Sequence, residues 1–134
     1  MLYYEIIEDK KKDLPALVFH DKTITFGELC AAVDKWAAIL QEKGVKKGDK
    51  IGLFSKNCDD FIVAYFAIIK AGGVVVPFNF QLAAKEVAYI VKDTKMKILL
   101  TRENKELGGA LADMGIDWPL VQITFAELHE VTEF

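Results

Sequence analysis

A nearly all-apolar helical segment, a pair of glycines and a β-branched run follow one another between residues 59 and 77. Asp59-Asp60 predicts a helix start, because acidic side chains offset the exposed amides and the dipole of a helix N-terminus. Gly72-Gly73 predicts the end of that helix near residue 71. The run 74–77 lacks polar alternation, which predicts a strand buried on both faces. A helix followed by a parallel strand is therefore expected here.

The same alternation extends over most of the chain. Periodicity and stop signals predict helices over residues 26–43, 59–71, 83–93 and about 103–114, and strands over 50–54, 74–77, 97–101 and 120–123. Strands and helices that alternate through short connections predict an α/β fold, with repeated βαβ units, a mainly parallel sheet and helices on both faces. We expect residues 1–134 to form a single α/β subdomain, with 1–14 as a lead-in and 15–134 as the core.

Local signals define the two ends of the chain more closely. Apolar runs at 16–20 and 23–26, separated by Asp21-Lys22, predict a short N-terminal β-hairpin. Thr25 with Glu28 has the spacing of a capping box, and Thr124 with Glu127 repeats it. A strand-to-helix junction is thus predicted at each of these threonines.

The helix predicted over 59–71 is apolar nearly all round, so it must be covered on more than one side. A chain of 134 residues leaves little to cover it. We therefore expect a further part of a larger protein to pack there, or self-association through the apolar surface.

Composition excludes several classes of partner. The net charge is -3, and the basic residues are scattered among acids, so no nucleic-acid partner is expected. The longest apolar stretch, 61–69, is too short for a transmembrane segment. Residues 1–5 lack a basic region followed by a long apolar run, so no secretory signal is expected, and Cys30 and Cys58 fit no zinc or redox spacing. Both features predict a cytoplasmic protein with reduced cysteines.

Searches for chemistry find no self-sufficient site. Neither phosphate-loop pattern occurs, and Gly72-Gly73 follows a helix where a phosphate cradle would precede one. His20 and His129 stand alone, with no Cys or carboxylate at ligand spacing, so no metal site is expected. Ser55, the only serine, has no recognisable base. The residues alone indicate a soluble α/β domain without catalytic groups.

Three segments, taken in order and spacing, carry a family resemblance that covers roughly residues 14–103: 24–51, 57–79 and 86–101. They resemble the opening of the adenylate-forming enzymes, which include acyl-CoA synthetases, luciferases and peptide-synthetase adenylation domains. The stretch from Lys70-Ala71-Gly72-Gly73 to Pro77 and Asn79 is the most specific part. Asparagine after Pro77-Phe78, rather than an acidic residue, favours fatty-acid or long-chain acyl-CoA synthetases. Phe80 departs from the second proline of many relatives.

The resemblance implies a two-step ligase reaction. ATP and a fatty or other carboxylic acid give an acyl-adenylate and pyrophosphate, and the CoA thiol then displaces AMP. ATP, Mg and CoA are the cofactors of such a full-length enzyme, whereas none is expected for this fragment. The family's catalytic motifs are expected downstream of this sequence. No catalytic or metal-binding residue is therefore predicted here, and the fragment alone is expected to be inactive.

By the same resemblance, Phe78, Asn79 and Arg102 map to the CoA nucleotide side of the full enzyme. An aromatic ring can stack on adenine, and an arginine can pair with a phosphate. The alternative is that Phe78 belongs to the core, Asn79 to a turn, and Arg102 to a solvated helix start. A second alternative concerns the whole chain, which could be a naturally short, non-catalytic binding or scaffolding module with the same fold.

Overall fold

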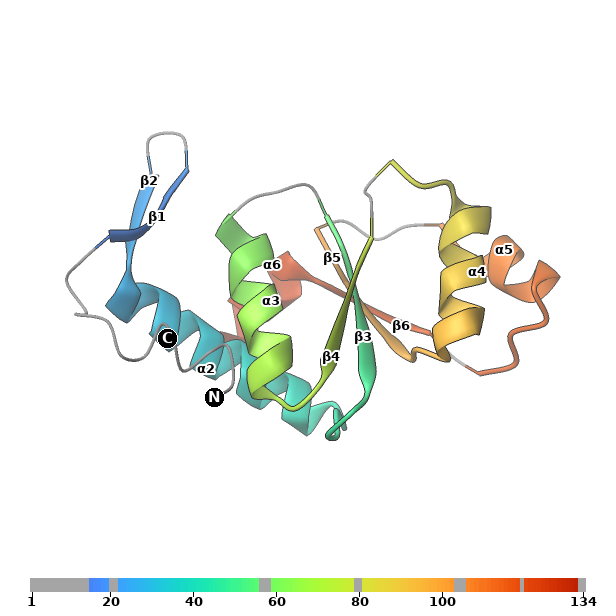
Figure 1. Cartoon of the computed structure of the whole chain (residues 1–134), viewed down its shortest axis with the longest axis horizontal. Helices are drawn as coiled ribbons and strands as arrows, with labels where there is room; N and C mark the ends of the chain where they lie inside the picture. Colours follow the sequence, from blue (N-terminus) through green and yellow to red (C-terminus); the bar gives the residue numbers. More distant parts are fainter. Residues whose placement is uncertain are drawn as a thin grey trace.

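A computed structural model describes residues 15–19, 22–55, 59–78, 81–102, 106–118 and 120–132 (Figure 1). The strands are β1 (Pro15–Phe19), β2 (Lys22–Thr25), β3 (Lys50–Phe54), β4 (Val74–Phe78), β5 (Ile98–Thr101) and β6 (Val121–Thr124). The helices are α2 (Phe26–Glu42), α3 (Asp59–Lys70), α4 (Ala84–Thr94), α5 (Gly108–Asp113) and α6 (Phe125–Thr132). Each helix and strand predicted after residue 25 is present, and the ends shift by at most one residue except for those of α5.

The predicted parallel sheet is confirmed. Four strands pair in parallel in the order β4-β3-β5-β6, so that α4 must carry the chain back across β3 to reach β5. Phe54, at the end of β3, aligns with Phe78 of β4 on one side and with Thr101 of β5 on the other. The carboxyl ends of these three strands therefore lie level at one edge of the sheet.

Helices cover both faces of this sheet (Figure 1). Buried residues of α2, α3 and α6 form one apolar cluster with β3, which includes Trp36, Leu40 and Ile68. Residues of α4, among them Val87 and Val91, form a second cluster with the other side of β5. The prediction of helices on both faces thus agrees with where the two clusters lie.

Both capping boxes are confirmed. Thr25 Oγ1 accepts a hydrogen bond of 3.1 Å from the Glu28 amide, and the Thr25 amide donates one of 3.2 Å to Glu28 Oε1. The same pair of bonds joins Thr124 and Glu127, at 3.2 and 3.0 Å. Each box satisfies exposed amides of a helix start, so each strand passes directly into its helix.

The predicted stop at Gly72-Gly73 is also confirmed. The Gly72 amide donates to the Ile69 carbonyl and the Gly73 amide to the Ile68 carbonyl, which is the pattern of a Schellman motif. Gly72 has a φ of +95°, a backbone conformation that a residue with a Cβ adopts only at a cost. The turn then leads straight into β4.

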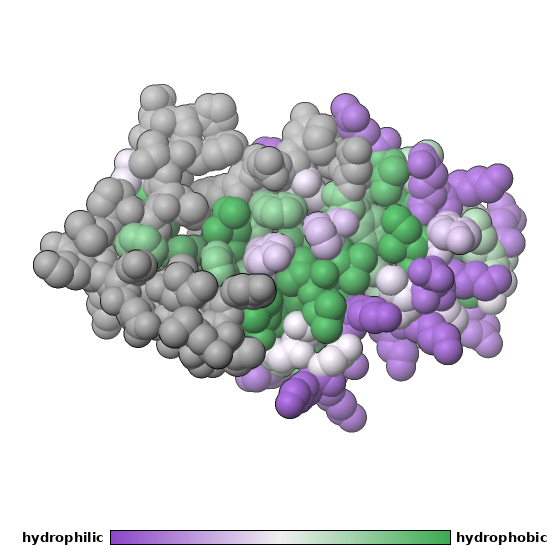
Figure 2. Space-filling model, in the orientation of Figure 1, coloured by the Kyte–Doolittle hydropathy of each residue, from purple (hydrophilic) through white to green (hydrophobic). Residues whose placement is uncertain are grey.

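The prediction that residues 74–77 are buried on both faces is wrong. The strand order places β4 at an edge of the sheet, with Val74 47% exposed and Pro77 also exposed. Proline has no amide to donate to a second neighbouring strand, so it is compatible with an edge position. Figure 2 shows apolar side chains gathered over α3 and β4 on this side of the molecule.

Two predictions near the chain ends differ in extent or lie partly outside the described residues. Helix α5 spans Gly108–Asp113 and is shorter than the predicted 103–114; residues 106–107 are not helical, and residues 103–105 lie outside the described residues. Strands β1 and β2 pair antiparallel, and residues 20–21 between them lie outside the described residues.

Contacts between distant segments hold the helices of one face together. His129 Nε2 of α6 lies 2.8 Å from Asp60 Oδ1 of α3, and its ring meets Trp36 of α2 edge-on at 5.2 Å between centroids. Lys70 of α3 also pairs with Asp34 of α2. Sequence spacing could not predict the first pair, because its members are 69 residues apart. Among the described residues, no helix has the length and apolar character needed to cross a membrane.

Candidate functional site at the carboxyl edge of the sheet

The strand order reverses between β3 and β5. From β3 the chain moves outward to β4 through α3, and α4 then returns it to the other side of β3. Helices α3 and α4 lie on opposite faces of the sheet, so the chain leaves the ends of β3 and β4 toward opposite sides (Figure 1). Ligands of open α/β sheets bind at such a reversal, outside the carboxyl ends of the strands. This edge is therefore the candidate site that the fold itself indicates.

Ser55, Thr101 and Arg102 lie at this edge, and the first two carry hydroxyl groups. Ser55 follows β3 and is buried, with 7% of its surface exposed. Thr101 ends β5 and is fully buried, and its Oγ1 has no hydrogen-bond partner among the described residues. A buried hydroxyl without a hydrogen-bond partner costs about 1–3 kcal/mol of stability, so the Thr101 hydroxyl does not contribute to holding the core together. Sequence reasoning did not single out this residue, because burial at a strand end has no local signature.

Phe78 lies at the predicted edge, but its side chain is only 5% exposed. Its ring meets that of Phe54 edge-on, with 6.1 Å between centroids, and belongs to the cluster that contains Val87 and Leu99. A ring enclosed in this way has no open face for a base. The packing role, which the sequence left as the alternative, is therefore favoured for Phe78.

Arg102 follows Thr101 directly and is exposed. The level alignment of β4, β3 and β5 brings Phe78 and Arg102 to the same edge, separated by β3. Asn79, the third predicted residue, lies outside the described residues. Arg102 is thus the predicted site residue that presents an accessible charge at this edge.

The described residues were also tested for fit to a nucleotide and its metal ion. The Gly72 and Gly73 amides are already bonded to carbonyls of α3, so they form no cradle for phosphates. The turn at Gly72-Gly73 therefore offers no free amides to a phosphate. Nor does the part of the chain that the structure describes contain three or more His, Cys, Asp or Glu side chains placed to hold a metal ion.

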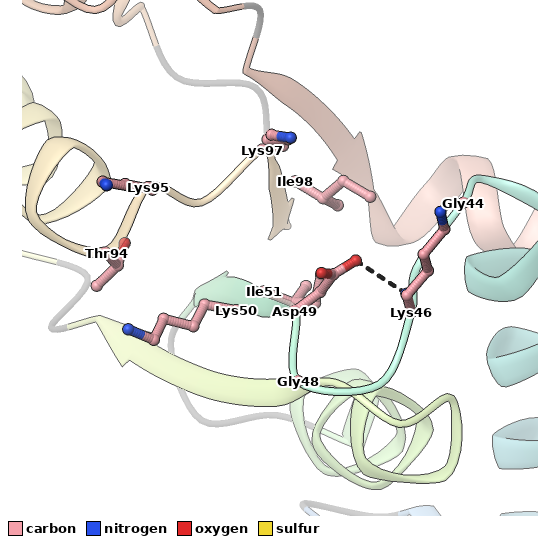
Figure 3. A pocket seen from close by; sticks show the side chains of 10 residues that line it. All are labelled: Gly44, Lys46, Gly48, Asp49, Lys50, Ile51, Thr94, Lys95, Lys97 and Ile98. Carbon is pink, nitrogen blue, oxygen red and sulfur yellow. Dashed lines mark hydrogen bonds between the residues drawn. The ribbon is translucent and has the colours of Figure 1, made fainter.

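A hollow at the opposite, amino edge of the sheet gathers residues that sequence reasoning had treated as scattered. Lys46 and Lys50 precede and begin β3, whereas Lys95 and Lys97 precede β5 (Figure 3). The parallel pairing of β3 with β5 brings these two lysine-bearing segments together. The sequence feature that could have predicted this hollow is a pair of lysines at or just before the start of β3 and of β5.

Comparison with known proteins now assigns the family. A family model described as AMP-binding enzyme matches residues 5–130. The chain is 33% identical over 103 residues to 4-hydroxybutyrate–CoA ligase 2 of Metallosphaera sedula, covering 77% of this chain and 19% of that protein. It is 32% identical over 89 residues to a long-chain-fatty-acid–CoA ligase of Bacillus subtilis, covering 66% and 16%.

Solved structures share the fold. The o-succinylbenzoate–CoA synthetase of Bacillus subtilis superposes with a TM-score of 0.81 and 25% identity, over 98% of this chain and 26% of that one. The chain therefore belongs to the AMP-binding enzyme family, whose members activate carboxylic acids as adenylates. It spans about a fifth of the length of the CoA ligase from Metallosphaera sedula.

The matches show the family but do not establish the narrower prediction of a fatty-acid enzyme. Surfactin synthase subunit 1 of Bacillus subtilis is 30% identical over 100 residues, nearly as similar as the two CoA ligases. The shared region is thus common to CoA ligases and peptide-synthetase adenylation domains.

Proposed function

We propose that this chain is the N-terminal structural platform of an AMP-forming carboxylic acid–CoA ligase, and that it catalyses no step alone. The observation that carries the proposal is the match over residues 5–130, combined with a coverage of only 19% of the CoA ligase from Metallosphaera sedula. The full protein would join a carboxylic acid to AMP with ATP and Mg, and CoA would then displace AMP. An o-succinylbenzoate–CoA synthetase with the same fold has been solved with ATP and magnesium ion.

The residue after Pro77-Phe78 supports a CoA ligase over a peptide-synthetase domain, because asparagine stands at Asn79 where the latter have an acidic residue. Ligases named for 4-hydroxybutyrate and long-chain fatty acids match the same region with nearly equal identity. Choice of the acid therefore depends on residues elsewhere in the full protein. A fatty acid is one of the carboxylic acids that the full protein could activate.

At the carboxyl edge, we propose that Arg102 attracts a phosphate of the CoA nucleotide, with Phe78 supporting the strand end from within. Asn79 stays a predicted contact of the same nucleotide. The exposure of Arg102 and its place directly after β5 support this role. A guanidinium can form two parallel hydrogen bonds to a phosphate. In this arrangement Phe78 positions the edge and does not touch the nucleotide.

The test is ATP–pyrophosphate exchange with the 134-residue chain and a panel of short- and long-chain acids. No exchange above the protein-free control is expected, and reproducible exchange with any acid would refute the proposal of an inactive platform. Reading the source gene beyond the codon for Phe134 is the complementary test. Continuation into a Thr/Ser/Gly-rich loop ending in Pro-Lys-Gly supports the ligase, whereas a stop codon favours the short scaffolding module.

A further inference from the structure

The hollow at the amino edge of the sheet has a volume of about 490 Å³. It lies between the α2–β3 connection and the α4–β5 connection, so two segments nearly fifty residues apart form its walls (Figure 3). Its size falls within the range of small-molecule sites, about 300–1,000 Å³. It lies at the end of the sheet opposite to the carboxyl edge, and it is independent of the proposed ligase site.

The walls of the hollow carry an excess of positive charge. Lys46, Lys50, Lys95 and Lys97 line it, against the single carboxylate of Asp49. Asp49 Oδ2 accepts a hydrogen bond of 2.8 Å from the Lys46 amide, so this carboxylate is engaged in holding the turn. Within the described residues, no carboxylate forms an ion pair with any of the four ammonium groups. The excess is notable in a chain whose net charge is -3.

The negative ends of nearby helices offset only part of this positive charge. Helices α2 and α4 both end beside the hollow, and each C-terminus has the effect of roughly half a negative charge. Together with Asp49 they offset about two of the four positive charges. About two remain, which is enough to attract an anion with more than one charge.

The backbone conformation of Lys95 is a second observation that singles out this hollow. Helices α2, α3 and α5 each end next to a glycine with positive φ, at Gly44, Gly72 and Gly115. Helix α4 instead has Lys95 in the left-handed region, with φ of +58°. Glycine would adopt this conformation with less strain. Lys95, which lines the hollow, is therefore held in a strained conformation that the ends of α2, α3 and α5 avoid.

We propose that this hollow binds a small oligophosphate anion through the lysines that line it, chiefly Lys50 and Lys95, whose side chains extend to the same side in Figure 3. The lining contains no aromatic residue on which a base could stack, and its loop amides at Gly44, Gly48 and Asp49 are bonded to carbonyls. Recognition therefore depends on the ammonium groups and is directed to phosphate charge rather than to a nucleoside. The ligand class comprises pyrophosphate, tripolyphosphate and compounds that carry such a group.

The experiment is calorimetric titration of the 134-residue chain with sodium tripolyphosphate at low ionic strength, repeated with ATP. We expect a dissociation constant of about 1 mM or below that rises steeply with salt, and ATP binding no tighter than tripolyphosphate. The double variant Lys50→Gln/Lys95→Gln should bind at least tenfold more weakly. The matched control Lys85→Gln/Lys92→Gln removes two charges of α4 that do not line the hollow, and its affinity should stay within about twofold of the parent chain.

Equal weakening in both double variants would overturn the site, because binding would then depend only on net charge. So would an absence of saturable binding up to about 10 mM, or a tenfold preference for ATP, which would indicate recognition of the nucleoside. Lys95→Gly separates binding from folding. We expect it to raise the melting temperature, since glycine relieves the strained backbone, while it weakens tripolyphosphate binding. Unchanged binding in this more stable variant would contradict the proposed role of Lys95.

Discussion

Replacing Gly72 by alanine tests how the turn between α3 and β4 is built. Gly72 has φ of +95°, and its amide and that of Gly73 close the end of α3. A Cβ at Gly72 would lie 3.3 Å from Lys47 Cα, which is a backbone atom and cannot turn away. The left-handed conformation alone costs about 1–2 kcal/mol for a residue with a Cβ. Crowding against Lys47 adds to it, so we expect a loss of about 2 kcal/mol or slightly more.

The same chain offers two controls that separate strain from crowding. Gly44 has φ of +96°, but a Cβ there meets nothing within 4 Å, so Gly44→Ala should cost only the strain, about 1 kcal/mol. Gly109 lies within α5, also with nothing within 4 Å, and Gly109→Ala should stabilise by about 0.5–1 kcal/mol. The expected order of stability is therefore Gly109→Ala, parent, Gly44→Ala, Gly72→Ala.

The assay is thermal unfolding by circular dichroism, together with urea unfolding to obtain the free energy. For a chain of this size, each kcal/mol corresponds to a change of about 3–5 °C in melting temperature, so Gly72→Ala should lower it by about 6–10 °C. If Gly72→Ala proves no less stable than Gly44→Ala, the close approach to Lys47 does not constrain the turn. If Gly72→Ala is as stable as Gly109→Ala, Gly72 does not adopt the left-handed conformation.

Three further substitutions test the cap, the strand end and the centre of the sheet by the same unfolding assays. Thr25→Ala removes the acceptor for the Glu28 amide and should cost about 1 kcal/mol; an unchanged free energy would mean that the capping box contributes nothing. Thr101→Val replaces a buried, unpartnered hydroxyl by a methyl group and should be neutral or stabilise by about 1 kcal/mol, so clear destabilisation would show that Oγ1 has a partner. Gly52→Ala places a Cβ 2.5 Å from Leu99 Cδ1 and should cost about 1–3 kcal/mol; a neutral result would mean that this side chain moves aside freely.

Much of the fold could be predicted because its signals are local. The capping box at Thr25 and Glu28 joins residues three apart, and the stop at Gly72-Gly73 joins amides to carbonyls of the preceding turn. Such contacts lie within one helical turn, so their residues identify them without knowledge of the rest of the chain. Helical spacing from Leu29 to Leu40 likewise identified a face that the structure buries.

The site could be predicted only in part. The resemblance placed Phe78 and Arg102 near one ligand, and parallel pairing does bring them to the same edge of the sheet. Whether a side chain at that edge faces outward or into the core depends on which helix packs beside it. The helices of the second cluster enclose Phe78, whereas Arg102, one residue past the end of β5, is exposed.

By itself, the sequence determined where helices and strands begin and end, the α/β class and the adenylate-forming family, because caps, glycine stops and periodicity act over a few residues. The tertiary structure decided the strand order, which put β4 at an edge and left Val74 exposed. It also brought His129 to Asp60, and the lysines before β3 to those before β5. These outcomes depend on the path of α4 across the sheet and on the packing of α6 against α2, and no short-range pattern encodes either.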